Sequence, residues 1–235
     1  LEFRRVLFRS DKTRDGQIKP VEELKGVELA TPNHMQGTLD LAMIWAMTLS
    51  YKPKKVVEIG SGFSSHAFDK ALTACRKRFP GDSRCASHVA IEPYRSEALK
   101  GLEEKVEILP LRLQEVDIAV FKQLEANDIL FIDSSHVMQP HGDVIMEFLF
   151  ILPVLKPGVV VHVHDIFLPY DYSTEWMDQG RPYTEQWLLA ALLMNNDAWE
   201  ILWPGHSMIV DHLESLGLPR HVDPITGSFW MRKVK

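Results

Sequence analysis

Residues 55–66 (KVVEIGSGFSSH) constrain the fold more than any other part of this sequence. The stretch opens with a short apolar run rich in β-branched residues, which is typical of a strand covered on both faces. Gly60 and Gly62 follow, and because glycine has no Cβ, they let the backbone turn sharply and approach a ligand closely. Ser64 and Ser65 can cap a helix whose free N–H groups would face that ligand. The stretch therefore predicts a strand, a ligand-binding turn and a helix.

An acid inside the predicted strand narrows the class of ligand. Glu58 lies just before the turn, where a carboxylate is costly to bury unless it accepts hydrogen bonds or meets a positive charge. A dinucleotide-binding turn reads G-x-G-x-x-G, with an acid about twenty residues further on. Here Ser65 stands at the third glycine position, and the next acid at a strand end is Glu92. The turn therefore suits the positively charged S-adenosylmethionine (SAM) better than a pyrophosphate.

The rest of the chain alternates predicted strands with predicted helices. The strands are Val56–Ile59, His88–Glu92, Val106–Leu109, Asp128–Asp133, Val159–Asp165, Trp199–Trp203 and Phe229–Val234. The helices are Gln36–Leu49, Ser64–Phe79, Ser96–Leu102, Val116–Leu124, Asp143–Leu152 and Tyr183–Asn195, with a short helix and loop in Gly205–Gly227. Such alternation is typical of a parallel sheet with helices on both faces, so we expect an α/β fold.

Length, charge and cysteine content limit the class of protein. The chain has 235 residues and a net charge of −6, and no basic run stands out beyond its first residues, so we expect neither nucleic acid nor a membrane as a partner. Cys75 and Cys85 favour free thiols and a cytoplasmic location, although one disulfide stays open. We expect an N-terminal arm over 1–30, then one domain over 31–235. Whether residues 1–10 are native stays open, as does a homo-oligomer.

Polar residues stand at the ends of the predicted parallel strands. They are Glu58, Glu92, Asp133 with His136, and His164 with Asp165. In an open α/β sheet, ligands bind outside the carboxyl ends of the strands, near the point where the strand order reverses. Acids also cap helices, so a structural role stays open for each. Their joint position nevertheless predicts a binding site at this edge of the sheet.

The pattern acid-x-Gly-x-Gly at 58–62 resembles the first motif of the class I SAM-dependent methyltransferases. The resemblance covers about Val56 to Asp165 and implies a Rossmann-like, doubly wound, mostly parallel seven-stranded sheet with an antiparallel last strand. It implies SAM contacts from Glu58, Gly60, Ser61, Gly62, Ser64, Ser65, Glu92, Gln114 and Asp133. Glu92 would accept hydrogen bonds from both ribose hydroxyls, which a carboxylate can do. Gln114 would lie near the adenine, and Asp133 near the reacting methyl group.

The segment FIDSSH at 131–136 resembles a small-molecule O-methyltransferase branch of that family. The implied reaction moves a methyl group from SAM to an oxygen of a small-molecule or sugar-like acceptor. Asp133, His136 and His164 are the expected catalytic residues, and the two histidines are the candidate bases because histidine titrates nearest neutral pH. His162 is expected to be structural. A long stretch after residue 168 predicts an acceptor-binding loop. Its expected substrate contacts are Tyr170, Tyr172, Trp176 and Arg181.

Some members of that branch, and relatives classed as antibiotic hydroxylases, hold a divalent cation. The matching positions here are Asp133, His164 and Asp165, and imidazole suits Mn²⁺, Fe²⁺ or Zn²⁺ better than Mg²⁺. A purely structural role for these three residues stays open. Two other functions also stay open: a metal-dependent, hydroxylase-like relative on the same fold, and a non-catalytic partner subunit. A nicotinamide-linked oxidoreductase is the least favoured.

Overall fold

The sheet organises the molecule. The computed structural model describes residues 37–80, 87–94, 99–102, 104–218 and 225–235, and its seven strands follow the order β3-β2-β1-β4-β5-β7-β6. The strands are β1 (Lys55–Ile59), β2 (Ser87–Ile91), β3 (Glu107–Leu109), β4 (Ile129–Ile132), β5 (Val160–Val163), β6 (Trp199–Pro204) and β7 (Phe229–Lys233). Strands β1 to β5 pair in parallel, and β7 is antiparallel to β5 and β6. The predicted Rossmann-like sheet with an antiparallel last strand is confirmed.

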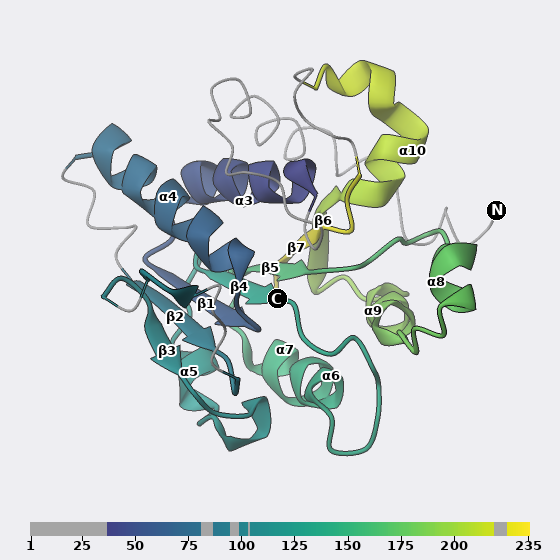
Figure 1. Cartoon of the computed structure of the whole chain (residues 1–235), viewed down its shortest axis with the longest axis horizontal. Coiled ribbons are helices and arrows are strands. Elements are labelled where there is room, and N and C mark those ends of the chain that lie inside the picture. The colour runs from purple at the N-terminus through teal and green to yellow at the C-terminus, as the bar shows by residue number, and fades with distance from the viewer. Residues whose placement is uncertain (1–36, 81–86, 95–98, 103, 219–224) are drawn as a thin grey trace.

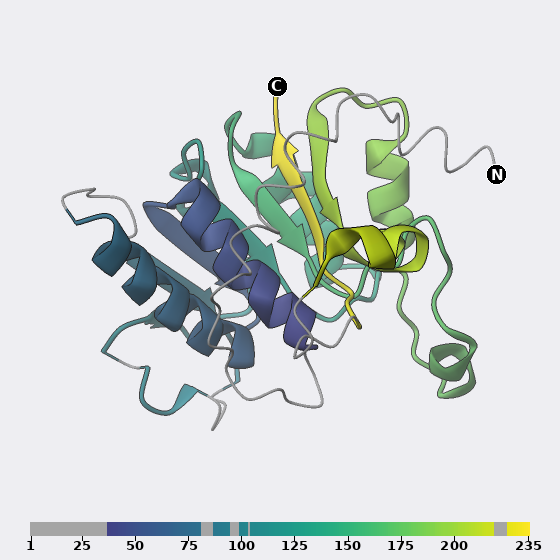
Figure 2. The same ribbon diagram turned by 90° about the horizontal axis from the view of Figure 1, so that it is seen from above.

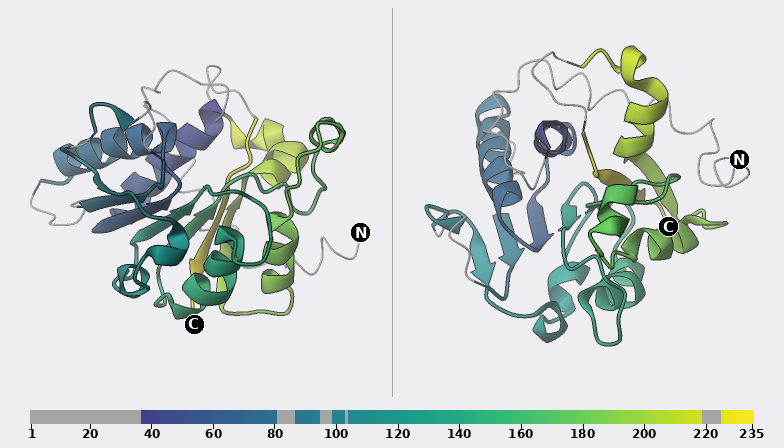
Figure 3. Two further views of the ribbon diagram at one scale, coloured as in Figure 1. Left: turned by 60° about the horizontal axis from the view of Figure 1, so that its bottom comes forward. Right: turned by 45° about the vertical axis from the view of Figure 1, so that its right-hand side comes forward.

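Helices cover both faces of this sheet (Figure 1). One face carries α3 (Thr38–Tyr51), α4 (Phe63–Arg78) and α10 (Gly205–Leu216), which lie in front of the strands in Figure 2. The other carries α5 (Ala119–Lys122), α6 (Asp143–Met146), a π-helical turn (Glu147–Ile151), α7 (Leu152–Val154) and α9 (Glu185–Leu193). The short helix α8 (Thr174–Asp178) stands out from the body at the end of the sheet away from β3 (Figure 3).

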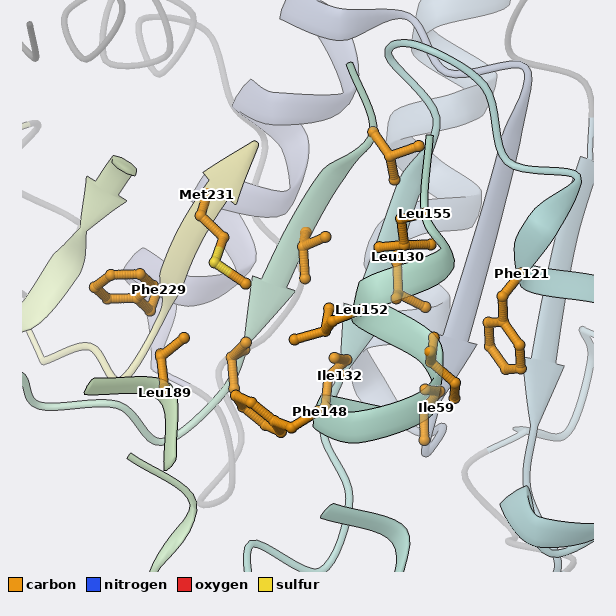
Figure 4. Packing of buried hydrophobic residues seen from close by; sticks show 14 of the residues in the cluster. Ile59, Phe121, Leu130, Ile132, Phe148, Leu152, Leu155, Leu189, Phe229 and Met231 are labelled. Atoms are coloured by element: carbon orange, nitrogen blue, oxygen red, sulfur yellow. The ribbon is translucent and has the colours of Figure 1, made fainter. Parts of the chain in front are cut away.

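Alternating side chains of each strand pack into two separate hydrophobic cores, one on each face of the sheet. Val57 and Ile59 point into the cluster formed with the α6, π-helical, α7 and α9 segments, which Figure 4 shows at close range. Val56 points into the opposite cluster, under α3 and α4. Because successive strand side chains face opposite sides, Glu58 shares the α4 side with Val56. This alternation places the acid of the turn motif beneath the helix that follows the turn.

Three predicted elements differ from those observed. The predicted helix 143–152 is interrupted by the π-helical turn directly before Pro153, which has no N–H to donate to a preceding carbonyl. The predicted helix 116–124 is reduced to α5, preceded by turns. The stretch expected to be a loop contains α8, whose N-cap Ser173 accepts a hydrogen bond from the Trp176 backbone N–H.

The cysteines differ from the expected free thiols. Cys75 is fully buried on α4 and is disulfide-bonded. The prediction of a free thiol is therefore wrong at this residue, and the alternative of a disulfide is correct. Cys85, the predicted arm over 1–30 and the predicted domain boundary at 30/31 lie outside the described residues. Within the described ranges, no helix is both long and apolar enough to cross a membrane.

Candidate active site

The turn after β1 requires glycine at position 60, because the backbone there lies close to the backbone at the end of β4. Gly60 has φ +82°, and a Cβ on it would lie 1.9 Å from the carbonyl oxygen of Asp133, at the end of β4. The next residue, Ser61, donates its backbone N–H to Glu92 Oε2 at 3.2 Å, at the end of β2. The turn therefore joins the ends of three neighbouring strands, next to the β1–β4 pair where the strand order reverses.

Glu58 supports this turn from beneath. Its carboxylate is fully buried, and Oε2 lies 2.6 Å from both Ser65 Oγ and His88 Nε2. Ser65 Oγ in turn accepts the backbone N–H of Gly62 at 3.3 Å. Among the described residues, the second oxygen of Glu58 is buried without a hydrogen-bond partner. Glu58 and Ser65, both expected at SAM, thus hold the turn in place.

His88 is a site residue that sequence reasoning missed. It lies in β2 opposite Val56, on the same side of the sheet as Glu58, and it is buried. Strand pairing brings the two side chains together although they are 30 residues apart in sequence. The only sequence signal is a histidine in an otherwise apolar strand, which does not reveal the register that pairs it with Glu58.

The other residues expected to contact SAM differ in their surroundings. Glu92 is half-buried, and its Oε1 accepts the backbone N–H of Tyr94 at 2.9 Å. Gln114 donates its side-chain amide to the carbonyl of His141 at 2.9 Å, and Ser64 is buried on α4. A Cβ added to Gly62 would meet nothing within 4 Å. A glycine turn open on one side, next to a partly exposed carboxylate, fits the ribose and the positively charged end of SAM.

The polar residues after β4 and β5 form one cluster. His136 Nε2 lies 3.4 Å from Asp133 Oδ1 and 3.7 Å from Asp165 Oδ2. His164 Nε2 lies 3.5 Å from Asp165 Oδ1. His136 and Asp165 both have left-handed backbones, with φ +60° and +55°. Non-glycine residues in this conformation carry strain, which is often found at functional sites. The structure thus gathers the four predicted residues that follow β4 and β5.

Charges within this cluster shift the ionisation of its members. Burial alone would raise the pKa of Asp133, but the charge of His164 and contact with His136 hold it well below its usual value. Burial would lower the pKa of His136, yet its contacts with Asp133 and Glu185 raise it well above 6.5. The pKa of Asp165 is raised, mainly by burial. The cluster therefore holds an ionised Asp133 next to an imidazole with enhanced basicity.

The arrangement of the Asp and His side chains in this cluster does not support a metal site. Across the described residues, no group of three His, Cys, Asp or Glu side chains is placed so that it could hold a metal ion. The three predicted ligands, Asp133, His164 and Asp165, therefore do not fit a metal as they stand.

His162, in β5, stacks on Phe131 with ring centroids 3.9 Å apart, and its Nε2 forms a hydrogen bond with Ser228 Oγ at 3.1 Å. These are the contacts of a packing residue.

An aromatic group lies beside the cluster. Tyr172, Trp176 and Tyr183 contact one another with ring centroids 5.5 to 6.1 Å apart, and Tyr183 lies 4.7 Å from the ring of His136. Arg181 is exposed and stacks 4.3 Å above Trp176. Three of the four expected substrate contacts thus gather near His136. The fourth, Tyr170, donates its hydroxyl to Asp211 of α10. Tyr183 was not predicted, since its role depends on how the chain folds back.

Comparison with known proteins agrees with this architecture. A family described as a methyltransferase domain matches residues 57–166. The SAH-bound methyltransferase PaMTH1 of Podospora anserina has a TM-score of 0.53 at 16% identity, covering 97% of this chain and 92% of that one. The O-methyltransferase TomG of Streptomyces achromogenes, involved in tomaymycin synthesis and solved with SAM, has a TM-score of 0.51 at 16% identity, and the match covers 100% of this chain and 94% of that one. An O-methyltransferase of Bacillus cereus with SAH has a TM-score of 0.50 at 15% identity, and the match covers 97% of this chain and 95% of that one.

The match to a methyltransferase domain over 57–166 and the shared fold confirm the resemblance to class I SAM-dependent methyltransferases that the motifs indicate. At these identities the solved structures establish the fold alone. An uncharacterized protein of Archaeoglobus fulgidus is 36% identical over 95 residues. That match spans 39% of this chain and 40% of the relative, so it covers less than half of either protein.

Proposed function

We propose that this protein transfers a methyl group from SAM to an oxygen of a small-molecule or sugar-like acceptor. The observation that carries the proposal is the convergence at one edge of the sheet. There the glycine turn and Glu92 lie beside the cluster of Asp133 and His136. The matched methyltransferase domain, residues 57–166, includes all of these residues. The two O-methyltransferases of similar fold support oxygen as the acceptor atom.

The chain's own residues would orient both reactants and remove one proton. SAM supplies an activated methyl group, so the protein needs only alignment and a base. Glu92 would accept the ribose hydroxyls, and the turn at Gly60 would allow the close approach. His136 is the proposed base, since its Nε2 lies 3.4 Å from Asp133 and 3.7 Å from Asp165, next to the proposed SAM site. His164 is the second candidate, in contact with Asp165.

The acceptor would meet the aromatic group. Tyr172 and Trp176 offer ring faces, and Arg181 offers a cation at the exposed end. The hydrogen bond from the Tyr170 hydroxyl to Asp211 of α10 would limit the movement of the segment that carries these aromatic residues. A small molecule with an apolar or ring-shaped body and a free hydroxyl fits this arrangement. The cytoplasmic location stays a prediction, and the disulfide at Cys75 counts against the free thiols on which it partly depended.

The first experiment is a calorimetric titration of the protein with SAM and, separately, with NAD, with and without added Mn²⁺. We expect SAM to bind and NAD not to bind. Glu92→Gln should weaken SAM binding at least about tenfold, because the neutral amide accepts less strongly from the ribose hydroxyls. Glu107→Gln, on the exposed side of β3, is the control and should bind as the wild type does. Equal SAM affinity in both variants would remove Glu92 from the site.

A second experiment measures turnover. SAH formation from SAM is followed with a panel of hydroxylated aromatic compounds, sugars and amines. Turnover with the hydroxyl compounds supports O-methylation, whereas turnover only with amines would contradict it. SAM binding without turnover on any acceptor would favour the non-catalytic partner subunit. Activity that requires added metal and oxidises the acceptor would favour the hydroxylase-like alternative.

A further inference from the structure

A buried carboxylate outside the predicted site contacts the proposed base. Glu185 Oε2, at the first residue of α9, lies 2.8 Å from His136 Nδ1. Glu185 is fully buried and His136 is 5% exposed. The other ring nitrogen of His136 faces Asp133 and Asp165. The imidazole therefore has one nitrogen toward Asp133 and Asp165 and the other toward Glu185.

The start of α9 also fixes the backbone on which His136 stands. The backbone N–H groups of Thr184 and Glu185 both donate to the carbonyl oxygen of His136, at 2.9 and 3.2 Å. Thr184 Oγ1 accepts the backbone N–H of Met138 at 2.8 Å. The ring of Tyr183 packs against the imidazole. Three consecutive residues, 183–185, thus contact His136 and help to hold its left-handed conformation, which a residue with a Cβ rarely adopts.

A second buried glutamate lies nearby but has a different environment. Glu147, in the π-helical turn, is fully buried, and within the described part of the chain neither of its carboxyl oxygens has a hydrogen-bond partner. Burial, and then the charge of Glu185, raise the pKa of Glu147 well above its usual value. Burial raises the pKa of Glu185 as well, but Glu185 differs from Glu147 because its hydrogen bond with His136 opposes that shift. Of these two buried glutamates, Glu185 is therefore the one that contacts an imidazole.

We propose that Glu185 is the positioning residue of His136, holding the Nδ1 proton so that Nε2 faces the acceptor. The inference depends on the proposed function in one respect only, which is the role of His136 as the base. A carboxylate that accepts from one nitrogen of a histidine sets the orientation and the tautomer of the ring. It also stabilises the imidazolium that forms when Nε2 takes a proton. Glu185 acts through His136 and does not touch the substrate.

The test compares two isosteric variants of fully buried glutamates, Glu185→Gln and Glu147→Gln. For Glu185→Gln we expect kcat to fall roughly 10²-fold, with SAM affinity unchanged, because the base loses its partner while the cofactor site stays intact. For Glu147→Gln we expect kcat close to the wild-type value, because within the described residues neither carboxyl oxygen of Glu147 forms a hydrogen bond to the imidazole. An equal loss of kcat in both variants, matched by equal loss of thermal stability, would show a structural role and overturn the proposal.

A second readout needs no acceptor. A proton shared between an imidazole nitrogen and a carboxylate gives a strongly downfield ¹H NMR signal, which ¹⁵N-histidine labelling assigns to Nδ1. We expect this signal in the wild type and in Glu147→Gln, and its loss or upfield shift in Glu185→Gln and in His136→Gln. Its absence from the wild type, or its persistence unchanged in Glu185→Gln, would overturn the proposal.

The two readouts separate this inference from the proposed function. If no SAH forms with any acceptor, the methyltransferase proposal fails, yet the NMR signal still decides whether Glu185 holds His136. If Glu185→Gln does not fold, Glu185→Asp provides the variant, since it keeps the charge but shortens the side chain by one methylene. A signal that Glu185→Asp leaves unchanged would contradict the contact, and one that it weakens would support it.

Discussion

At the scale of single residues, two backbone positions show how tightly the site is built. Gly60 has a positive φ and lies against the Asp133 carbonyl, so any side chain there meets backbone atoms. Gly62, two residues on, has an extended φ of 168° and open space around it. The two glycines of one motif therefore serve different ends: Gly60 shapes the turn, whereas Gly62 leaves room beside it.

We expect Gly60→Ala to lower the free energy of unfolding by about 1–3 kcal/mol and to abolish SAM binding, because the turn must move away from β4. Gly62→Ala is the matched control for stability and should unfold like the wild type, since its Cβ meets nothing. Chemical denaturation and calorimetric titration with SAM measure the two effects. Equal stability of the two variants would contradict the close approach at Gly60.

The pKa of His136 predicts how activity depends on pH. Contacts with Asp133 and Glu185 raise this pKa well above 6.5, so the neutral imidazole needed for a base appears only at higher pH. We expect kcat/KM to rise with pH through an apparent pKa above 6.5. The stability that these contacts contribute has the opposite trend: it is fully present below the unfolded-state pKa and is lost as pH rises through the folded pKa.

The measurement is a pH profile of SAH formation from neutral to mildly alkaline conditions. His136→Gln should remove the rise along with most of the activity. His212→Gln, on the exposed side of α10, should keep the wild-type profile. A profile that is flat over this range in the wild type would argue against His136 as the base.

At the scale of elements, one buried network joins β1, β2 and α4. Ser65, in the first turn of α4, donates to Glu58 of β1, which also contacts His88 of β2. The same hydroxyl accepts from Gly62 at the helix start. The helix is thus fixed to the two strands whose ends flank the proposed SAM site, so its N-terminus keeps its place beside the turn.

Ser65→Ala should lower the free energy of unfolding by about 1–3 kcal/mol, because Glu58 would lose one of its two partners while remaining fully buried. Urea denaturation followed by circular dichroism gives this value. Ser215→Ala provides the control, since that hydroxyl is near the end of α10 and donates only to a nearby carbonyl. A change below about 0.5 kcal/mol in Ser65→Ala, as for an ordinary surface site, would contradict the network.

At the scale of the whole molecule, the site is a meeting of strand ends that are distant in sequence. The ends of β1, β2, β4 and β5 supply the turn, Glu92 and the acid–histidine cluster, and α9 adds Glu185 from further along the chain. A ligand bound there contacts several elements at once. Its binding free energy therefore contributes to the stability of the folded chain as a unit.

We expect SAM at about a hundred times its dissociation constant to stabilise the protein by about 2.7 kcal/mol, seen as a higher unfolding temperature. NAD at the same concentration should leave the temperature unchanged. Differential scanning fluorimetry measures both, with Glu92→Gln as the variant expected to show a smaller increase. A shift with NAD and none with SAM would contradict the proposed cofactor.

Much of this architecture was predictable from local pattern. The β-branched runs, the turn at Gly60 and the alternation of strands and helices predicted a Rossmann-like sheet, and their positions agree with it to within a few residues. Asp133, His136, His164 and Asp165 were selected because parallel strands end at one edge. That argument needs only the direction of the strands, and the alternation of strands and helices along the sequence indicates that they are parallel.

The fold class, the glycine turn and the set of polar residues at the strand ends follow from periodicity and chain direction, so they could be predicted from the amino-acid sequence. Which of these residues contact one another depends on the folded molecule. The strand register places His88 beside Glu58, and the position of α9 brings Glu185 to His136, 49 positions earlier in the sequence. Contacts of this kind depend on how elements pack in space, and no local pattern of residue types encodes that packing.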